Sequence, residues 1–138
     1  MKILIVDGSA DIRERLVTML RAMPNVEIAG QAPTAAEAMN AVRQLQPHVI
    51  ILDARLPAAA GMDLLQAMHR EQIRTFVIVL IDDNVKALAR AAGAHVFLHK
   101  TRELSAIPGL IHSLSSDFAA AAETPSRAPI PPAKEAPG

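Results

Sequence analysis

Three charged residues could act together if the chain brings them to one place. Asp7 and Asp53 each come directly after a run of aliphatic residues, and Lys100 stands two positions after a third apolar run. If these runs are parallel strands of one sheet, their carboxyl ends meet at the edge where open α/β sheets bind ligands. Two carboxylates and one ammonium would then share a site.

Such a site suits the transfer of a phosphoryl group. Two carboxylates can hold Mg²⁺, which prefers oxygen ligands and keeps several waters. One carboxylate can attack phosphorus to form an aspartyl phosphate, while the lysine contacts a phosphoryl oxygen. Taken singly, each residue has a plainer explanation, since an aspartate after a strand is often a helix cap and a lone lysine is usually solvated. The hypothesis depends on the three positions agreeing.

The elements that must position these residues follow from hydrophobic patterns. Short continuous apolar runs are typical of parallel strands that are covered on both faces. Five such runs predict strands at Ile3–Val6, Val26–Ala29, Val49–Leu52, Phe76–Ile81 and His95–Leu98. A strand order of 2-1-3-4-5 would make the strands that precede Asp7 and Asp53 neighbours.

Segments with helical periodicity separate the strands. The pattern Thr34–Glu37 is a capping box at a helix start, and Pro108 is well placed in the first turn of a last helix. The apolar stripes of the other helices fall within Ile12–Met23, Leu64–Met68 and Val85–Ala92. The fold class is therefore α/β, a doubly wound five-stranded parallel sheet with helices on both faces.

Length and composition exclude several classes of protein. The chain has 138 residues, the size of one domain, and no cysteine, which excludes a disulfide framework and a thiol nucleophile. With 14 basic and 14 acidic residues the net charge is zero, so we expect no direct contact with nucleic acid. No apolar run is long enough to span a membrane, and we expect a cytoplasmic protein.

The end of the chain differs in composition from the rest. Five of the ten prolines fall between residues 119 and 138, mixed with alanine, serine and charged residues. We therefore expect a folded domain over residues 1–118 and a disordered tail or linker over residues 119–138. The tail is compatible with a link to an output domain and equally with the end of a single-domain protein.

Three segments resemble bacterial response-regulator receiver domains of two-component signalling. They are Ile3–Asp7, Ile50–Pro57 and Phe97–Lys100, and the resemblance extends over about Met1 to Ser116. The spacing after Asp53 also matches, with Pro57 at the end of the second segment and Gly61 beyond it. Each segment alone is a weak signal, whereas the combination is specific.

The resemblance implies a flavodoxin-like fold and a set of roles. Asp53 would accept a phosphoryl group from a histidine kinase, and Asp7 would be one of the acidic residues around Mg²⁺. Lys100 would contact the phosphoryl group. Phe97 matches the aromatic switch residue of the fifth strand, whose ring turns inward on activation. Such a domain is a signalling switch and not an enzyme in the ordinary sense.

Two positions depart from the family pattern. Gly8 stands where the family has a second acidic residue that binds the metal, so we expect Mg²⁺ to bind weakly. Ile81 stands where the family has serine or threonine, so the hydroxyl that contacts the phosphoryl group is missing. These departures favour an alternative function, a pseudo-receiver that acts as a protein-interaction module without phosphorylation. A small enzyme of the doubly wound class has support only from fold analogy.

Partners are also implied by the resemblance. They are a histidine kinase, a downstream protein, and a second copy of the chain docking through the fourth helix, the fifth strand and the fifth helix. Asp82 and Asp83 follow Ile81 and are best explained as the start of the fourth helix. His95 and His99 have no evident third ligand, so we do not expect a metal site there.

Overall fold

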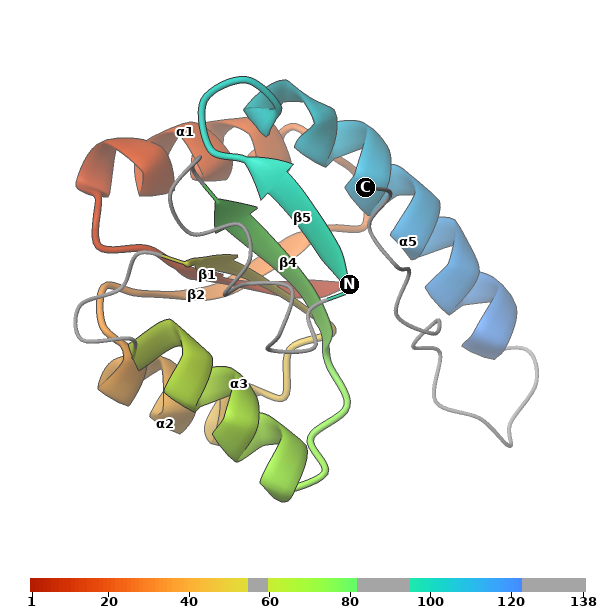
Figure 1. The fold of residues 1–138 in the computed structure, drawn as a ribbon. Helices are drawn as coiled ribbons and strands as arrows, with labels where there is room; N and C mark the ends of the chain where they lie inside the picture. Colours follow the sequence, from red (N-terminus) through yellow and green to blue (C-terminus); the bar gives the residue numbers. More distant parts are fainter. Residues whose placement is uncertain (55–59, 82–94, 123–138) are drawn as a thin grey trace.

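Strands and helices alternate along the chain in the computed structural model, which describes residues 1–54, 60–81 and 95–122 (Figure 1). The described elements, in chain order, are β1 (Lys2–Val6), α1 (Ala10–Arg21), β2 (Glu27–Ala32), α2 (Ala35–Leu45), β3 (Val49–Asp53), α3 (Ala60–Arg70), β4 (Phe76–Ile81), β5 (Val96–His99), a 3₁₀ turn η2 (Leu104–Ala106) and α5 (Ile107–Ala122).

The five strands form one parallel sheet in the order β2-β1-β3-β4-β5, which confirms the predicted topology. Strand β1 pairs with β3 in register from Ile3 opposite Val49 to Val6 opposite Leu52. The residues that end β1 and β3 are therefore neighbours at the carboxyl edge of the sheet.

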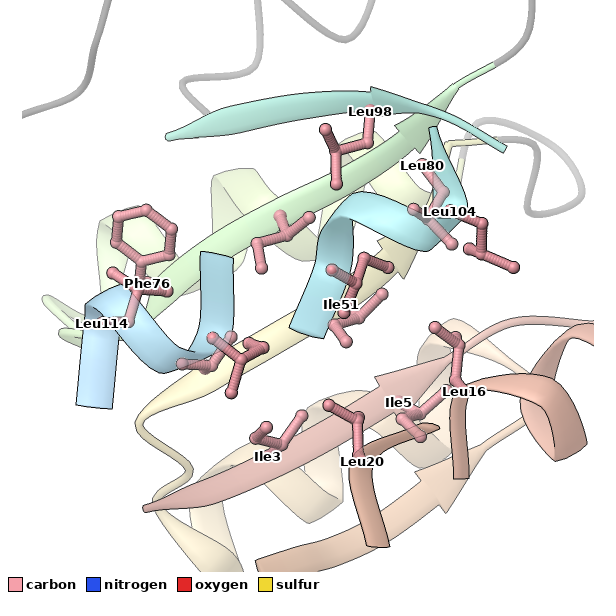
Figure 2. Packing of buried hydrophobic residues seen from close by; sticks show 14 residues of the cluster. Ile3, Ile5, Leu16, Leu20, Ile51, Phe76, Leu80, Leu98, Leu104 and Leu114 are labelled. Carbon is pink, nitrogen blue, oxygen red and sulfur yellow. The ribbon is translucent and has the colours of Figure 1, made fainter. Parts of the chain in front are cut away.

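Helices cover both faces of the sheet, with α2 and α3 on one side and α1 and α5 on the other (Figure 1). Because successive side chains of a strand point to opposite faces, each strand supplies both layers of the core. On β1, Leu4 and Val6 pack toward α2 and α3, whereas Ile3 and Ile5 pack toward α1 and α5. Figure 2 shows the second layer. This double coverage explains why the strands are continuously apolar.

The helix ends follow from local sequence. The Ser9 side chain accepts a hydrogen bond from the backbone N–H of Ile12 at the start of α1, and Thr34 does the same for Glu37 at the start of α2. Gln46 is the C-cap residue that follows α2, and it adopts a left-handed backbone conformation with φ of 48°. Ser9 caps α1 and stands two residues after Asp7. Its capping bond therefore also determines where the chain leaves the carboxyl edge of the sheet.

Strand β2 extends three residues past its predicted end, and helix α5 extends into the segment that we had assigned to the tail. Strand β2 continues through the polar Gly30 and Gln31 to Ala32, because its backbone pairs with β1 after a bulge opposite Ile3 and Leu4. Helix α5 continues to Ala122 and so includes the alanines from residue 119 that we had assigned to the tail. Alanine has the highest helix propensity, which explains the continuation. The domain boundary at residue 118 stays a prediction.

Some predictions concern parts of the chain outside the described residues. These are the fourth helix with Val85–Ala92, the acidic pair Asp82 and Asp83, the position of Pro57, and the tail from residue 123. Within the described ranges, no helix has both the length and the apolar character that crossing a membrane requires.

Candidate functional site

The carboxyl edge of the sheet gathers the three charged residues singled out in the sequence. Asp7 follows β1, Asp53 is the last residue of β3, and Lys100 follows β5. The backbone N–H of Lys100 donates to the carbonyl oxygen of Ile81, 2.8 Å away, so the turn after β5 is joined to the end of β4. Pairing across four strands thus brings residues 93 positions apart to one edge.

The side chains of these residues meet in one cluster. The Lys100 Nζ lies 3.0 Å from Asp53 Oδ2 and 3.3 Å from Asp7 Oδ2. The side chains of Asp7 and Asp53 are 1% and 7% exposed, and that of Lys100 is 20% exposed. The predicted convergence of the three residues is confirmed. The Lys100 ammonium therefore forms ion pairs with two almost fully buried carboxylates.

Asp7 is the electrostatically costly member of the cluster. Burial is the main cause that raises the pKa of its carboxyl, and the nearby charge of Asp53 raises it further. The backbone N–H of Ser9 and the ammonium of Lys100 act in the opposite direction and lower this pKa, but they do not offset the burial. The site thus holds a carboxylate whose negative charge is only partly stabilised.

The two carboxylate oxygens of Asp7 differ in their surroundings. Oδ1 accepts a hydrogen bond of 2.8 Å from Ser9, whereas the buried Oδ2 accepts none within the described part of the chain. Lys100 Nζ is within ion-pair distance of Oδ2 but forms no hydrogen bond with it. A buried oxygen without a hydrogen bond is a natural ligand atom for a cation.

The residues present fit a divalent cation in part. Asp7 and Asp53 offer the carboxylate oxygens that Mg²⁺ prefers. Among the described residues, however, no group of three His, Cys, Asp or Glu side chains could hold a metal. Gly8 is exposed, and among the described residues a Cβ added there would meet the Pro33 carbonyl oxygen at 3.8 Å, an ordinary contact. A side chain can therefore begin at this position without a clash with the described part of the chain.

The other predicted residues lie around the cluster or outside the described ranges. Ile81 is buried at the end of β4 and offers only its backbone carbonyl to the turn after β5. Phe97 is half-buried and packs against the core layer under α2 and α3. Gly61 lies in the first turn of α3, and Pro57 is not among the described residues.

The sequence analysis missed residues that support the cluster. The Arg13 Nη1 donates to the backbone carbonyl oxygen of Asp7 at 2.6 Å, which ties α1 to the end of β1. The signal for this contact was present, because Arg13 stands one helical turn after the Ser9 cap. His99 and Glu103 form hydrogen bonds in the turn that carries Lys100. A pattern of residue types alone does not reveal these turn contacts.

Comparison with protein families gives a clear match. A profile of the family described as "Response regulator receiver domain" matches residues 3–112. The chain is 35% identical over 80 residues to a protein-glutamate methylesterase/protein-glutamine glutaminase of Agrobacterium fabrum, covering 58% of this chain and 22% of that protein. It is 29% identical over 116 residues to the transcriptional regulatory protein BtsR of Salmonella typhi, covering 84% and 48%. The chain thus spans between about a fifth and about half of these relatives.

Solved structures share the fold. The signal receiver domain of the putative response regulator NarL from Mycobacterium tuberculosis superimposes with a TM-score of 0.73 at 23% identity, covering 83% of this chain and 95% of that one. The response regulator domain of Thermotoga maritima CheB superimposes with a TM-score of 0.65 at 23% identity, covering 89% and 93%. At this identity the likeness concerns the fold alone.

Proposed function

Because the chain belongs to the response regulator receiver domain family, we propose that it is a switch in which Asp53 accepts a phosphoryl group from a histidine kinase. The observation that carries the proposal is the position of Lys100 Nζ, 3.0 Å from Asp53 Oδ2 and close to Asp7 at the carboxyl edge of the sheet. Of the two carboxylates, Asp53 is the more exposed, with 7% of its side chain accessible against 1% for Asp7. It is therefore the better placed to meet a donor.

The transfer is a displacement at phosphorus. An Asp53 carboxylate oxygen forms the new O–P bond while the P–N bond of the phosphohistidine breaks, and the imidazole nitrogen keeps the electron pair. Lys100 stands where it can pair with an oxygen of the arriving phosphoryl group. Once Asp53 is phosphorylated, the negative charge of the acyl phosphate lies on the phosphoryl oxygens, and the ammonium can turn from the carboxylate to these oxygens. Asp7 remains ionised on the other side of Lys100.

Mg²⁺ would be held by Asp7 and Asp53, and when bound it would neutralise charge on the phosphoryl oxygens. The buried Asp7 Oδ2 supports this assignment, since it accepts no hydrogen bond among the described residues. With Gly8 in place of a third carboxylate, one oxygen ligand and one negative charge are lost. We therefore propose weak binding of the metal.

A second candidate is a pseudo-receiver that signals by binding alone. Gly8 and Ile81 favour it, because they remove a metal ligand and the hydroxyl that would contact the phosphoryl group. The cluster itself is also compatible with this function, since Lys100 forms ion pairs with both carboxylates. In that case the cluster would be a structural feature of the carboxyl edge.

Partners follow from the proposed switch. The kinase would present its phosphohistidine at the carboxyl edge, and a downstream protein or a second copy would bind a face that includes β5 and α5. The methylesterase relative is matched over only 22% of its length, and we do not transfer its activity to this chain. We propose a signalling domain whose only chemistry is its own phosphorylation and dephosphorylation.

Labelling with a small phosphodonor tests the proposal. The protein is incubated with acetyl phosphate and Mg²⁺, and intact mass is measured for a gain of ~80 Da, the mass of a phosphoryl group that replaces a proton. Wild type and Asp63→Ala, which removes an exposed acid of α3, should be labelled, whereas Asp53→Ala should not. Labelling that persists in Asp53→Ala, or no labelling of wild type, would reject Asp53 as the acceptor, and the second result would favour the pseudo-receiver.

A further inference from the structure

The turn that carries Lys100 is closed by its own side chains. The backbone N–H of His99 donates to Glu103 Oε1 at 2.8 Å, and the backbone N–H of Glu103 donates to the carbonyl oxygen of His99 at 3.0 Å. Both backbone polar groups of His99 are thus bonded to Glu103. The five residues 99–103 form a closed turn between β5 and η2.

The imidazole of His99 closes the same turn from inside. Its Nδ1 lies 3.2 Å from the backbone nitrogens of both Thr101 and Arg102, and each of these nitrogens donates a hydrogen bond to it. The Thr101 hydroxyl oxygen is 3.1 Å from the same atom. Because backbone N–H groups can only donate, Nδ1 is the acceptor of both bonds. The ring acts as the side-chain acceptor does in an Asx turn.

These bonds bear directly on where the Lys100 ammonium lies. Lys100 stands between His99 and the two N–H groups that His99 accepts, and its own N–H is held by Ile81. Beyond the turn, Leu104 is 2% exposed and anchors η2 in the core. Since a lysine side chain is long and flexible, the place of its ammonium depends on the direction in which the backbone points it. A turn without internal bonds would leave that direction poorly defined.

We infer that His99, with Glu103, is a positioning residue that holds the backbone of Lys100 so that Nζ reaches both Asp53 and Asp7. In sequence, His99 carried no predicted role, since no metal site was expected there, and the fold suggests this one. The inference deepens the proposed function and rests on it where the rate of phosphoryl transfer is concerned. The position of the ammonium can be tested without any phosphorylation.

The first measurement is the reactivity of the Lys100 amine. Wild type, His99→Leu, His99→Asn and Glu103→Ala are treated briefly with an amine-acetylating reagent, and acetylation at each lysine is measured by peptide mass spectrometry. In wild type the amine is shielded between two carboxylates. His99→Leu should raise the initial rate at Lys100 about fivefold, the scale expected for losing a side-chain hydrogen bond. His99→Asn restores an acceptor and should reverse most of that increase.

Two controls identify a general loss of structure. The rate at the exposed Lys2 should be the same in every variant, and His112→Leu, the same change at an exposed position of α5, should leave Lys100 as in wild type. Glu103 is exposed, so Glu103→Ala should fold even if His99→Leu does not, and it should raise the Lys100 rate in the same direction. An unchanged Lys100 rate in Glu103→Ala and in folded His99→Leu would overturn the inference.

The second measurement is the rate of labelling by acetyl phosphate. His99→Leu should label about tenfold more slowly than wild type, since a misplacement of ~1 Å can cost up to a hundredfold in rate. The His99→Asn variant should recover most of that rate. If wild type is not labelled at all, the proposed function fails while the amine reactivity still decides the inference. If wild type labels and His99→Leu labels equally fast, the inference fails alone.

Discussion

The two edges of the sheet treat their polar groups in opposite ways. At the amino edge, the Thr75 hydroxyl donates to the carbonyl oxygen of Pro47 at 3.1 Å, and His95 Nδ1 accepts from the N–H of Val77 at 3.0 Å. His48 accepts from the N–H of Lys2 in the same manner. At the carboxyl edge, two carboxylates share one ammonium, and a buried oxygen of Asp7 accepts no hydrogen bond among the described residues.

The difference shows which edge is built for stability and which for binding. At the amino edge, the side chains of His48, Thr75 and His95 are each bonded to a backbone group. The carboxyl edge keeps like charges together in a buried place, which costs stability unless a cation or a reaction relieves it. Substitutions at the two edges should therefore differ in kind.

Removing the shared cation should have the largest effect. Lys100→Met keeps the aliphatic stem and removes the ammonium that pairs with both carboxylates, which should lower the free energy of unfolding by about 2 kcal/mol near pH 7. Because Lys100 is one-fifth exposed, we expect less than the ~3–5 kcal/mol typical of fully buried pairs. Protonation of a carboxylate in the folded state should reduce the loss as pH falls toward 5. Urea unfolding at several pH values measures both effects, and unchanged stability at pH 7 would contradict the account.

An acidic residue at position 8 should increase the affinity of the carboxyl edge for Mg²⁺. Gly8→Asp adds a third carboxylate without steric conflict, so Mg²⁺ should bind about tenfold more tightly. The same charge should destabilise the metal-free protein by about 1 kcal/mol, since it adds a like charge near Asp7. Gly8→Asn is the matched uncharged control. Calorimetric titration of each variant with Mg²⁺ measures its affinity for the metal. The same Mg²⁺ affinity in Gly8→Asp and Gly8→Asn would argue against a metal site at this edge.

A substitution at the amino edge should affect stability alone. Thr75→Val removes the buried hydroxyl and leaves the Pro47 carbonyl without its partner, which should cost about 1 kcal/mol. Labelling by acetyl phosphate should proceed at the wild-type rate, because the change is at the far end of β4 from Lys100. If Thr75→Val loses labelling rate together with stability, a change at the amino edge also affects the site, and the distinction between the two edges fails.

The smallest expected effect is a pH dependence from His95. Burial lowers the pKa of this histidine in the folded state, so near its ordinary pKa the unfolded chain binds a proton that the folded chain does not. The free energy of unfolding contributed by this residue should therefore fall as pH drops below about 6.5. His95→Asn keeps an acceptor for Val77 and should flatten this slope between pH 7.5 and 5.5. Equal slopes in both proteins would show that His95 does not titrate as argued.

The fold could be predicted because its signals are local and repeated. Five apolar runs and the helical stripes between them are consequences of a sheet buried on both faces. The strand order in the structure agrees with the predicted order. The end of β2 could not be predicted, because Gly30 and Gln31 are in a strand only through pairing with β1. For the last helix the sequence analysis gave a start and a buried face but no end, and the alanine run from residue 119, which is helical in the structure, was attributed to the tail.

The site was predictable where it depends on strand ends and unpredictable where it depends on turns. Asp7, Asp53 and Lys100 were recognised because each follows an apolar run, and parallel pairing then brings them together. The contacts of His99 depend on turn geometry that residue types do not specify, whereas the contact of Arg13 could have been inferred from its spacing after the Ser9 cap. The departures at Gly8 and Ile81 were visible in sequence, but only the structure shows that the space beside Gly8 is open.

The most direct test follows the backbone amides of both edges in ¹H–¹⁵N spectra when Mg²⁺ and acetyl phosphate are added. We expect the amide signals of Asp7, Ala54 and Thr101 to move in wild type but not in Asp53→Ala, while those of Lys2 and Val77 stay in place in both proteins. Signals that move equally in the two proteins, or only at the amino edge, would contradict a phosphoryl-accepting site at the carboxyl edge.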